Sequence, residues 1–137
     1  MKVERTLIIG WSPIPTRYRL TSPKGEVYVR CGADLILNGL RGDVDAEAIC
    51  PVCGSPVKFS VRVNHVVNLQ PPETLLHIVE IPGPDTMIEC GATHLFDKEA
   101  CLRLWQETYK GPKGSIYTPQ GFTDYWLPRQ ALPVPSK

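Results

Sequence analysis

The sequence contains no long apolar run, and none of its apolar stretches approaches the roughly 18 residues that a membrane-spanning helix needs. Near the start of the chain only residues 7–9 are continuously apolar before Gly10, which is too short for the apolar region of a secretory signal peptide. We therefore expect a protein that works in the cytoplasm without a membrane partner.

The sequence also lacks an excess of charge of either sign, because 15 lysines and arginines stand against 14 aspartates and glutamates. No run of like charges occurs that would follow a phosphate backbone or form a solvated tail. We therefore expect no nucleic-acid partner. Hydrophobic residues make up 42% of the chain and charged residues 21%, which is typical of a folded globular protein.

Proline is abundant, with 14 residues among 137, about twice the usual share. Prolines and glycines divide the chain into short strand-like segments, and no repeat or linker separates them. We expect a single α+β domain over residues 1–137, mostly antiparallel sheet, with frayed ends at 1–6 and 129–137. The expected strands are 17–20, 26–30, 44–49, 57–63 and 75–81.

Residues 57–63 alternate between apolar and polar, which predicts that Val63 shares a buried face with Val57. The one well-defined helix is expected over residues 97–109, with Asp97 as its N-cap, and shorter helical turns include residues 34–40. Cys101 lies on the apolar face of the longer helix, so we interpret it as a core residue.

The five cysteines cannot all form disulfides with one another, and a chain of this length does not need disulfides to fold. We therefore expect free thiols in a reducing compartment, where cysteines commonly serve as metal ligands or reactive groups. The three histidines are assigned no role as ligands.

Cys50 and Cys53 belong to the segment Cys-Pro-Val-Cys-Gly, which matches one half of a tetrahedral zinc site. No second Cys-x-x-Cys or His-x-x-x-His follows, so the other ligands are not evident. Three interpretations of Cys50 and Cys53 remain open: they are zinc ligands, a secondary thiol pair, or two buried residues of a turn. A redox dithiol is less favoured because the motif does not begin a helix in a βαβ unit.

Cys31 lies where an expected strand meets a short helix, with Asp34 one turn further on. The backbone N–H groups at a helix start favour a thiolate at Cys31. A thiol and a carboxyl held together could carry nucleophilic or metal chemistry with proton transfer. The spacing alone favours the simpler interpretation, in which Asp34 caps the helix and Cys31 is a core residue. Cys90 is a third candidate, again at the end of a strand-like stretch and next to a glycine.

Together these segments resemble the organomercurial (alkylmercury) lyase family. Residues 27–35 are similar to the family segment in which a tyrosine precedes Cys-Ala-Leu-Asp, and the family's cysteine and aspartate fall on Cys31 and Asp34. Residues 50–57 resemble a segment with a structural cysteine, which falls on Cys50. Residues 89–96 resemble the segment with the second catalytic cysteine, which falls on Cys90.

The resemblance extends over residues 8–126 and includes two departures from the family. It implies the catalytic portion without the usual N-terminal winged-helix-like domain, and a homodimer could replace that domain. Cys53 stands where the family has threonine, which turns a lone cysteine into a pair.

The resemblance implies an enzyme that cleaves carbon–mercury bonds by protonolysis and needs no cofactor. Cys31 and Cys90 would bind mercury, Asp34 would transfer the proton, and Hg(II) would be the bound product. The implied partners are an organomercurial substrate and cellular thiols or a mercury-handling protein that accepts Hg(II). The alternative is a non-catalytic domain in which Cys31, Cys50, Cys53 and Cys90 form a structural zinc site with four cysteine ligands.

Overall fold

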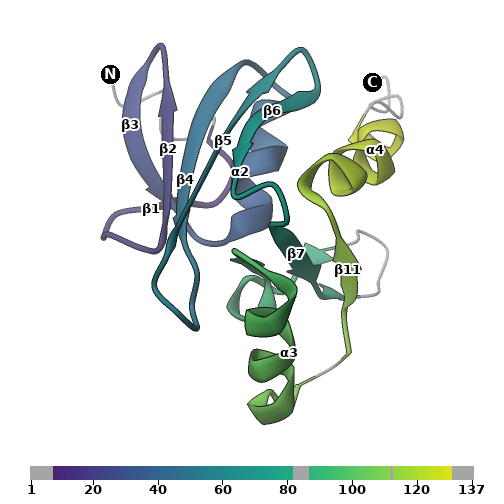
Figure 1. Cartoon of the computed structure of the whole chain (residues 1–137). Helices are drawn as coiled ribbons and strands as arrows, with labels where there is room; N and C mark the ends of the chain where they lie inside the picture. The colour runs from purple at the N-terminus through teal and green to yellow at the C-terminus, as the bar shows by residue number, and fades with distance from the viewer. Residues whose placement is uncertain (1–7, 82–86, 112, 131–137) are drawn as a thin grey trace.

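The structure is a computed structural model that describes residues 8–81, 87–111 and 113–130 (Figure 1). Its largest element is a six-stranded sheet of order β1-β3-β2-β4-β5-β6, in which every neighbouring pair is antiparallel. The strands are β1 Trp11–Ser12, β2 Tyr18–Ser22, β3 Gly25–Val29, β4 Val44–Ile49, β5 Pro56–Arg62 and β6 His65–Gln70. The predicted α+β fold with mostly antiparallel strands is confirmed.

The alternation in β5 produces its buried face, since Val57, Phe59 and Val61 are all buried. The prediction that Val63 shares this face is wrong. Val63 lies beyond the end of β5, where the chain turns into β6 with φ values of 50° at Val63 and 67° at Asn64, and its side chain is 76% exposed. The apolar pattern therefore continues one position further than the strand.

A second, three-stranded sheet has the order β10-β7-β11, and β7 pairs antiparallel with both neighbours. The expected strand 75–81 is divided here, because β7 ends at Ile78 and a two-stranded ladder of β8 and β9 follows. These strands are β7 Leu75–Ile78, β8 Glu80–Ile81, β9 Met87–Ile88, β10 His94–Phe96 and β11 Ser115–Tyr117.

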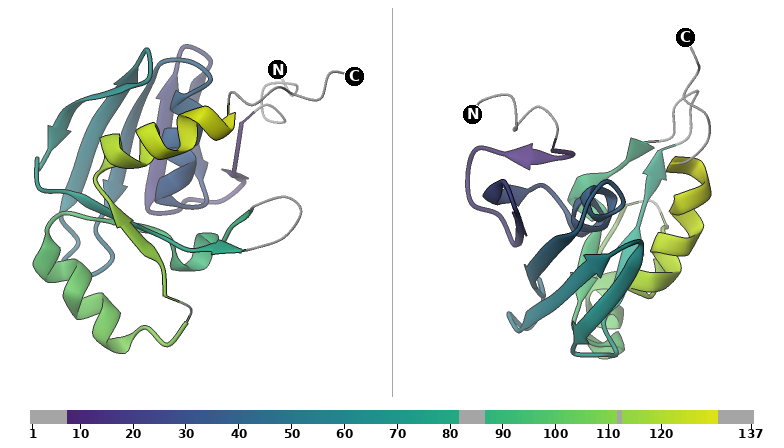
Figure 2. Two further views of the ribbon diagram at one scale, coloured as in Figure 1. Left: turned by 90° about the vertical axis from the view of Figure 1, so that its right-hand side faces the viewer. Right: turned by 90° about the horizontal axis from the view of Figure 1, so that it is seen from above.

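Helix α2, Gly32–Gly39, lies between the two sheets, and all eight of its residues are buried. It contacts β2, β4 and β5 of the large sheet, β7 and β10 of the small sheet, and the C-terminal helix α4, Pro119–Gln130. Figure 2 shows α4 lying across α2, and α4 also contacts β6 at the edge of the six-stranded sheet. Each sheet buries its inner face against this one short helix.

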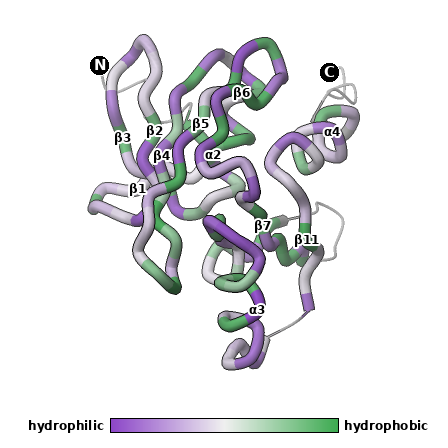
Figure 3. The backbone as a smooth tube through the Cα atoms, viewed as in Figure 1, coloured by the Kyte–Doolittle hydropathy of each residue, from purple (hydrophilic) through white to green (hydrophobic). Residues whose placement is uncertain are grey.

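Helix α3, Glu99–Thr108, confirms the expected long helix but begins later than predicted. Its N-cap is Lys98 in an extended conformation, so Asp97 is not the cap. Figure 3 shows both hydrophobic and hydrophilic residues along α3. Only Cys101 and Leu102 of this helix are buried, as expected for a helix on the surface.

Helix α4 was not predicted, since Gly121 and the internal Pro128 disfavour a helix and no apolar stripe marks its face. Tertiary packing decides its conformation, because Phe122 and Thr123 are fully buried. The expected frayed end at 129–137 is helical in its backbone as far as Gln130. Residues 131–137 and the expected frayed start at 1–6 lie outside the described residues.

None of the helices within the described ranges is both long and apolar enough to cross a membrane. Where α2 ends, a close approach to the large sheet requires glycine. A Cβ atom on Gly39 would lie 2.6 Å from Cβ of the fully buried Val61.

The substitution Gly39→Ala should therefore destabilise the fold. We expect a loss of about 1–3 kcal/mol in the free energy of unfolding, because overpacking a dense core forces side chains and backbone to shift. Urea denaturation followed by circular dichroism measures this loss. Gly42→Ala is the matched control, since nothing lies within 4 Å of its added Cβ. Equal stability of the two variants would contradict the close approach of α2 to β5.

Candidate functional site

Cys31 and Asp34 form the N-terminal cap of α2. Cys31 is the N-cap residue, with φ −151° and ψ 171°, and Asp34 is the third residue of the helix. The backbone N–H of Cys31 donates to Oδ2 of Asp34 at 3.2 Å, which closes one half of a capping box. Both side chains are buried, at 0% and 4% exposure. The Cys-x-x-Asp spacing thus forms a helix cap, which is the interpretation that the spacing alone favours. It also holds a thiol next to a carboxyl.

Cys90 joins this pair from a distant part of the chain. It begins the short 3-10 helix η1, Cys90–Ala92, which leads into β10. Its Sγ lies 3.9 Å from Oδ2 of Asp34. The two sulfurs and a carboxylate oxygen of Asp34 all lie within 4.8 Å of one another. The structure therefore brings together the three residues proposed from the sequence, while their chemical roles stay a prediction.

Gly10 is a close neighbour of this group that sequence analysis did not identify. It has a φ of 74°, and a Cβ atom in its place would overlap the carboxylate of Asp34. Asn38 fixes the segment, because its Nδ2 donates to Ile9 O at 2.9 Å and its Oδ1 accepts from Ile9 N at 2.9 Å. The carboxyl group is thus confined from the side of the N-terminal segment. Nothing in the sequence around Gly10 indicates this contact.

The electrostatics of the two thiols differ from the sequence-based prediction. A hydrogen bond donated by Cys31 lowers the pKa of the Cys90 thiol below its ordinary value. The same bond, together with burial, raises the pKa of the Cys31 thiol. The prediction of a thiolate at Cys31 is therefore wrong, because its side chain is fully buried while Cys90 is half-exposed to solvent. The pair favours a thiol at Cys31 and a thiolate at Cys90.

The Asp34 carboxyl is the third member of this electrostatic arrangement. Burial raises its pKa above the ordinary value for aspartate, and the hydrogen bond from the Cys31 backbone opposes this shift only in part. A carboxyl with a raised pKa carries its proton at a higher pH and can deliver it to a bound group. The site therefore contains a soft nucleophile, a second thiol and a buried acid.

His94 serves in packing, as expected. Its Nδ1 lies 2.6 Å from the hydroxyl oxygen of Tyr18, and its ring contacts Phe96 and Trp105. Burial lowers the pKa of His94 to about 4, so the ring is neutral at physiological pH. It belongs to neither of the groups of potential metal ligands found in the described part of the chain.

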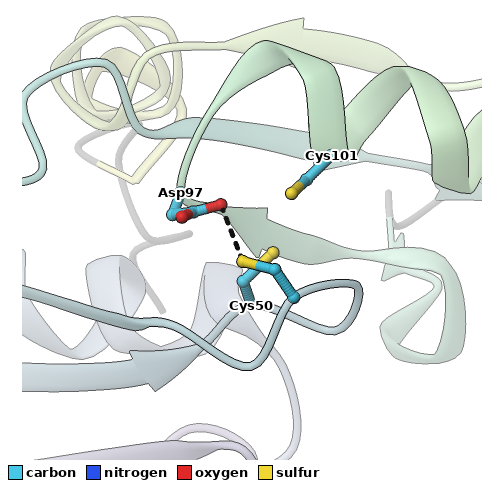
Figure 4. Close-up of side chains that lie close together, drawn as sticks. Cys50, Asp97 and Cys101 are labelled. Carbon is cyan, nitrogen blue, oxygen red and sulfur yellow. Dashed lines mark hydrogen bonds between the residues drawn. The ribbon is translucent and has the colours of Figure 1, made fainter.

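Cys50 and Cys53 lie in a different group, with Asp97 and Cys101. The four ligand atoms lie within 4.8 Å of one another, and Figure 4 shows Cys50, Asp97 and Cys101 directed toward a common point. Cys101 is buried, as expected for a core residue, but the sequence did not indicate that it lies beside Cys50, Cys53 and Asp97. The alternative zinc site with four cysteine ligands is wrong, because Cys31 and Cys90 group with Asp34 instead.

The fold and the first group define a class of protein. Two thiols and a buried carboxyl, at the start of a helix enclosed by antiparallel sheets, can bind a soft metal and exchange a proton beside it. The alkylmercury lyase family matches residues 11–124, and the chain belongs to that family. The predicted family resemblance is confirmed.

Curated relatives agree with this family assignment, and a solved structure shares the fold. Alkylmercury lyases of Bacillus cereus and Clostridium butyricum are each 28% identical over 116 residues, covering 80% of this chain and 52% of the relative. The chain thus spans about half the length of these curated relatives. A crystal structure of the mercury-bound form of MerB2 shares the fold, with a TM-score of 0.72 and 23% identity over 88% of this chain and 60% of that one.

The unequal pKa values of the two thiols lead to a testable pH dependence. Cys90 should react with iodoacetamide at a pH below the range of an ordinary thiol, because the thiolate is the nucleophile. Cys31→Ala removes the hydrogen bond, so the pKa of Cys90 should rise and its alkylation near neutral pH should slow several-fold. Peptide-resolved mass spectrometry of the alkylated protein over a pH series measures both rates.

Cys53 provides the internal control in the same digests, since it lies in the other cysteine group and its alkylation should not respond to Cys31→Ala. An unchanged alkylation profile at Cys90 would contradict the hydrogen bond between the two thiols.

Proposed function

We propose that this chain cleaves the carbon–mercury bond of organomercurials by protonolysis, releasing a hydrocarbon and leaving Hg(II) bound to two sulfurs. The observation that carries the proposal is the grouping of Cys31, Asp34 and Cys90 within 4.8 Å of one another. Family membership supports it, since the two curated relatives are named alkylmercury lyases.

The thiols supply the metal-binding part of the proposed reaction. Hg(II) is a soft cation that prefers thiolate ligands over oxygen. The Cys90 thiolate attacks the mercury atom first and displaces the thiolate that accompanies the substrate in solution. Cys31 then binds as the second sulfur and loses its proton to the Asp34 carboxylate. The lowered pKa of Cys90 supports this order, because it increases the share of the nucleophilic thiolate at Cys90 relative to an ordinary thiol.

The carboxyl group supplies the proton in the proposed second step. Two sulfur ligands push electron density onto the carbon, which departs only as it is protonated. Asp34 donates the proton it received from Cys31, the carbon–mercury bond breaks, and a carbon–hydrogen bond forms. The proton of Cys31 thus ends on the hydrocarbon, and the bond pair of the carbon–mercury bond stays with carbon. The raised pKa of Asp34 favours its role as an acid.

Product release completes the proposed cycle. Solution thiols or a mercury-handling protein exchange onto Hg(II) and return Cys31 and Cys90 to their starting states. All groups in these steps belong to the chain, the substrate or the exchanging thiol, so no cofactor enters the proposal. The cysteines at 31, 50, 53, 90 and 101 are all free, which supports a reducing location such as the cytoplasm. A homodimer stays a prediction.

Loss of any of the three site groups should abolish turnover. We expect Cys31→Ser, Cys90→Ser and Asp34→Asn each to lower hydrocarbon release from an arylmercury salt in excess thiol by at least about 100-fold. Asp34→Asn should still bind Hg(II), because both sulfurs remain, whereas each serine variant should bind it far more weakly. Gas chromatography of the hydrocarbon and mercury analysis after gel filtration measure the two properties.

The control for Asp34→Asn is Asp45→Asn, because Asp45 is an exposed aspartate on β4 that pairs with Arg62. Its turnover should equal that of the unmodified protein. Unimpaired turnover in all three site variants would refute the proposed reaction.

Gly10→Ala should impair turnover through the position of Asp34. The added Cβ would displace the carboxylate, so we expect a decrease of about tenfold or more in turnover while Hg(II) binding by the two thiols is retained. Gly25→Ala is the matched control, since Gly25 also has a positive φ, of 125°, but nothing lies within 4 Å of its added Cβ. Both variants incur backbone strain, and only Gly10→Ala should lose activity. Equal loss in both would assign the effect to strain instead.

A further inference from the structure

We propose that Cys50, Cys53, Asp97 and Cys101 form a structural zinc site that joins the turn after β4 to the start of α3. The sequence offers two of these ligands as a pair, and the fold supplies the other two. The site is distinct from the group of Cys31, Asp34 and Cys90, so it stands independently of the proposed lyase reaction.

The turn between β4 and β5 has the geometry of a metal knuckle. Gly54 donates its N–H to Cys50 O at 3.0 Å, and Cys50 donates its N–H to Ser55 O at 2.9 Å. Gly54 has a φ of 77°, which a side chain would disfavour. This tight turn brings the sulfurs of Cys50 and Cys53 into one group of potential ligands. Cys-x-x-Cys followed by glycine is typical of one half of a zinc site.

The start of α3 supplies the other half. Asp97 lies just before the helix and Cys101 in its first turn, and a carboxylate oxygen and the sulfur lie within 4.8 Å of each other. Asp97 is only 6% exposed and Cys101 only 3%. A carboxylate at this depth among thiols needs a partner to offset its desolvation. Lys98 Nζ reaches Oδ2 at 3.2 Å, while Oδ1 faces the cysteines.

The separations match a tetrahedral zinc ion. Zn–S bonds of about 2.3 Å and Zn–O bonds of about 2.0 Å place neighbouring sulfurs roughly 3.7 Å apart and a sulfur and an oxygen roughly 3.5 Å apart. Cys53 Sγ and Asp97 Oδ1 lie 3.3 Å apart, and all four ligand atoms lie within 4.8 Å of one another. A small contraction around a central ion would complete the site.

The donor set favours zinc in a structural role. Three thiolates with one carboxylate suit a borderline-soft ion, and magnesium or calcium would require oxygen ligands instead. Four protein ligands fill the tetrahedron and leave no open position for a substrate. The bound ion would connect the large sheet, through β4 and β5, to α3 and the small sheet. Asp97 directly follows β10, so this link also fixes the strand that η1 and Cys90 precede.

Metal analysis of the whole chain tests the proposal. Protein purified in reducing, chelator-free buffer, from cells grown with zinc and without mercury, should contain about one zinc per chain. Cys53→Ala and Asp97→Asn should each reduce this to below about a tenth, and Asp97→Cys should restore it because a thiolate replaces the carboxylate. Cys53 is exposed, so its replacement leaves no cavity in the core. Cys90→Ser should keep the full zinc content.

Cobalt(II) provides a readout that does not depend on the variants. Chelator-treated protein titrated with Co(II) in the absence of oxygen should show intense thiolate charge-transfer and tetrahedral d–d absorption that saturates at about one equivalent and disappears on adding Zn(II). Zinc-free protein that shows no such spectrum would overturn the proposal. So would zinc that stays bound in Cys53→Ala and Asp97→Asn but is lost in Cys90→Ser.

Discussion

The capping interaction at the start of α2 is the contact on which the rest of the structure depends. Asp34 accepts a hydrogen bond from the backbone of Cys31, and this bond fixes both the first turn of the helix and the distance between a thiol and a carboxyl. Both sheets bury their inner faces against α2, so the cap also sets where the two sheets meet. One local interaction thus determines helix, interface and candidate site together.

The two cysteine groups both lie where the large sheet meets the small one, at opposite ends of β10. Cys31 starts from the large sheet and Cys90 from the segment that leads into the small one, so the proposed reaction centre spans their junction. Cys50 and Cys101 span the same junction at the opposite end of β10, where Asp97 follows it. A strand of only three residues therefore lies between a group suited to exchange of metal and a group suited to its permanent retention.

Local patterns in the sequence predicted much of this fold, and long-range contacts account for the failures. Alternation in β5 and the turn before β3 identify part of the large sheet, because β2 with β3 and β4 with β5 pair as neighbours in sequence. Family-like motifs marked Cys31, Asp34 and Cys90. By contrast, α4 has no amphipathic stripe and forms because Phe122 is buried by distant residues. The proximity of Asp97 and Cys101 to Cys50, and the effect of burial on the Cys31 thiol, likewise exist only after folding.

The buried carboxyl of Asp34 has a thermodynamic consequence for the whole fold. The pKa of Asp34 is raised on folding, because burial favours the neutral acid. The contribution of this group to the stability of the fold is therefore fully present at low pH and is lost as the pH rises through the folded-state pKa. Above that pKa an ionised Asp34 opposes folding, and the net favourable packing of α2 must outweigh that effect. The property that equips this group to hold a proton therefore lowers the stability of the fold, and the protein retains it in the first turn of α2, a helix whose eight residues are all buried.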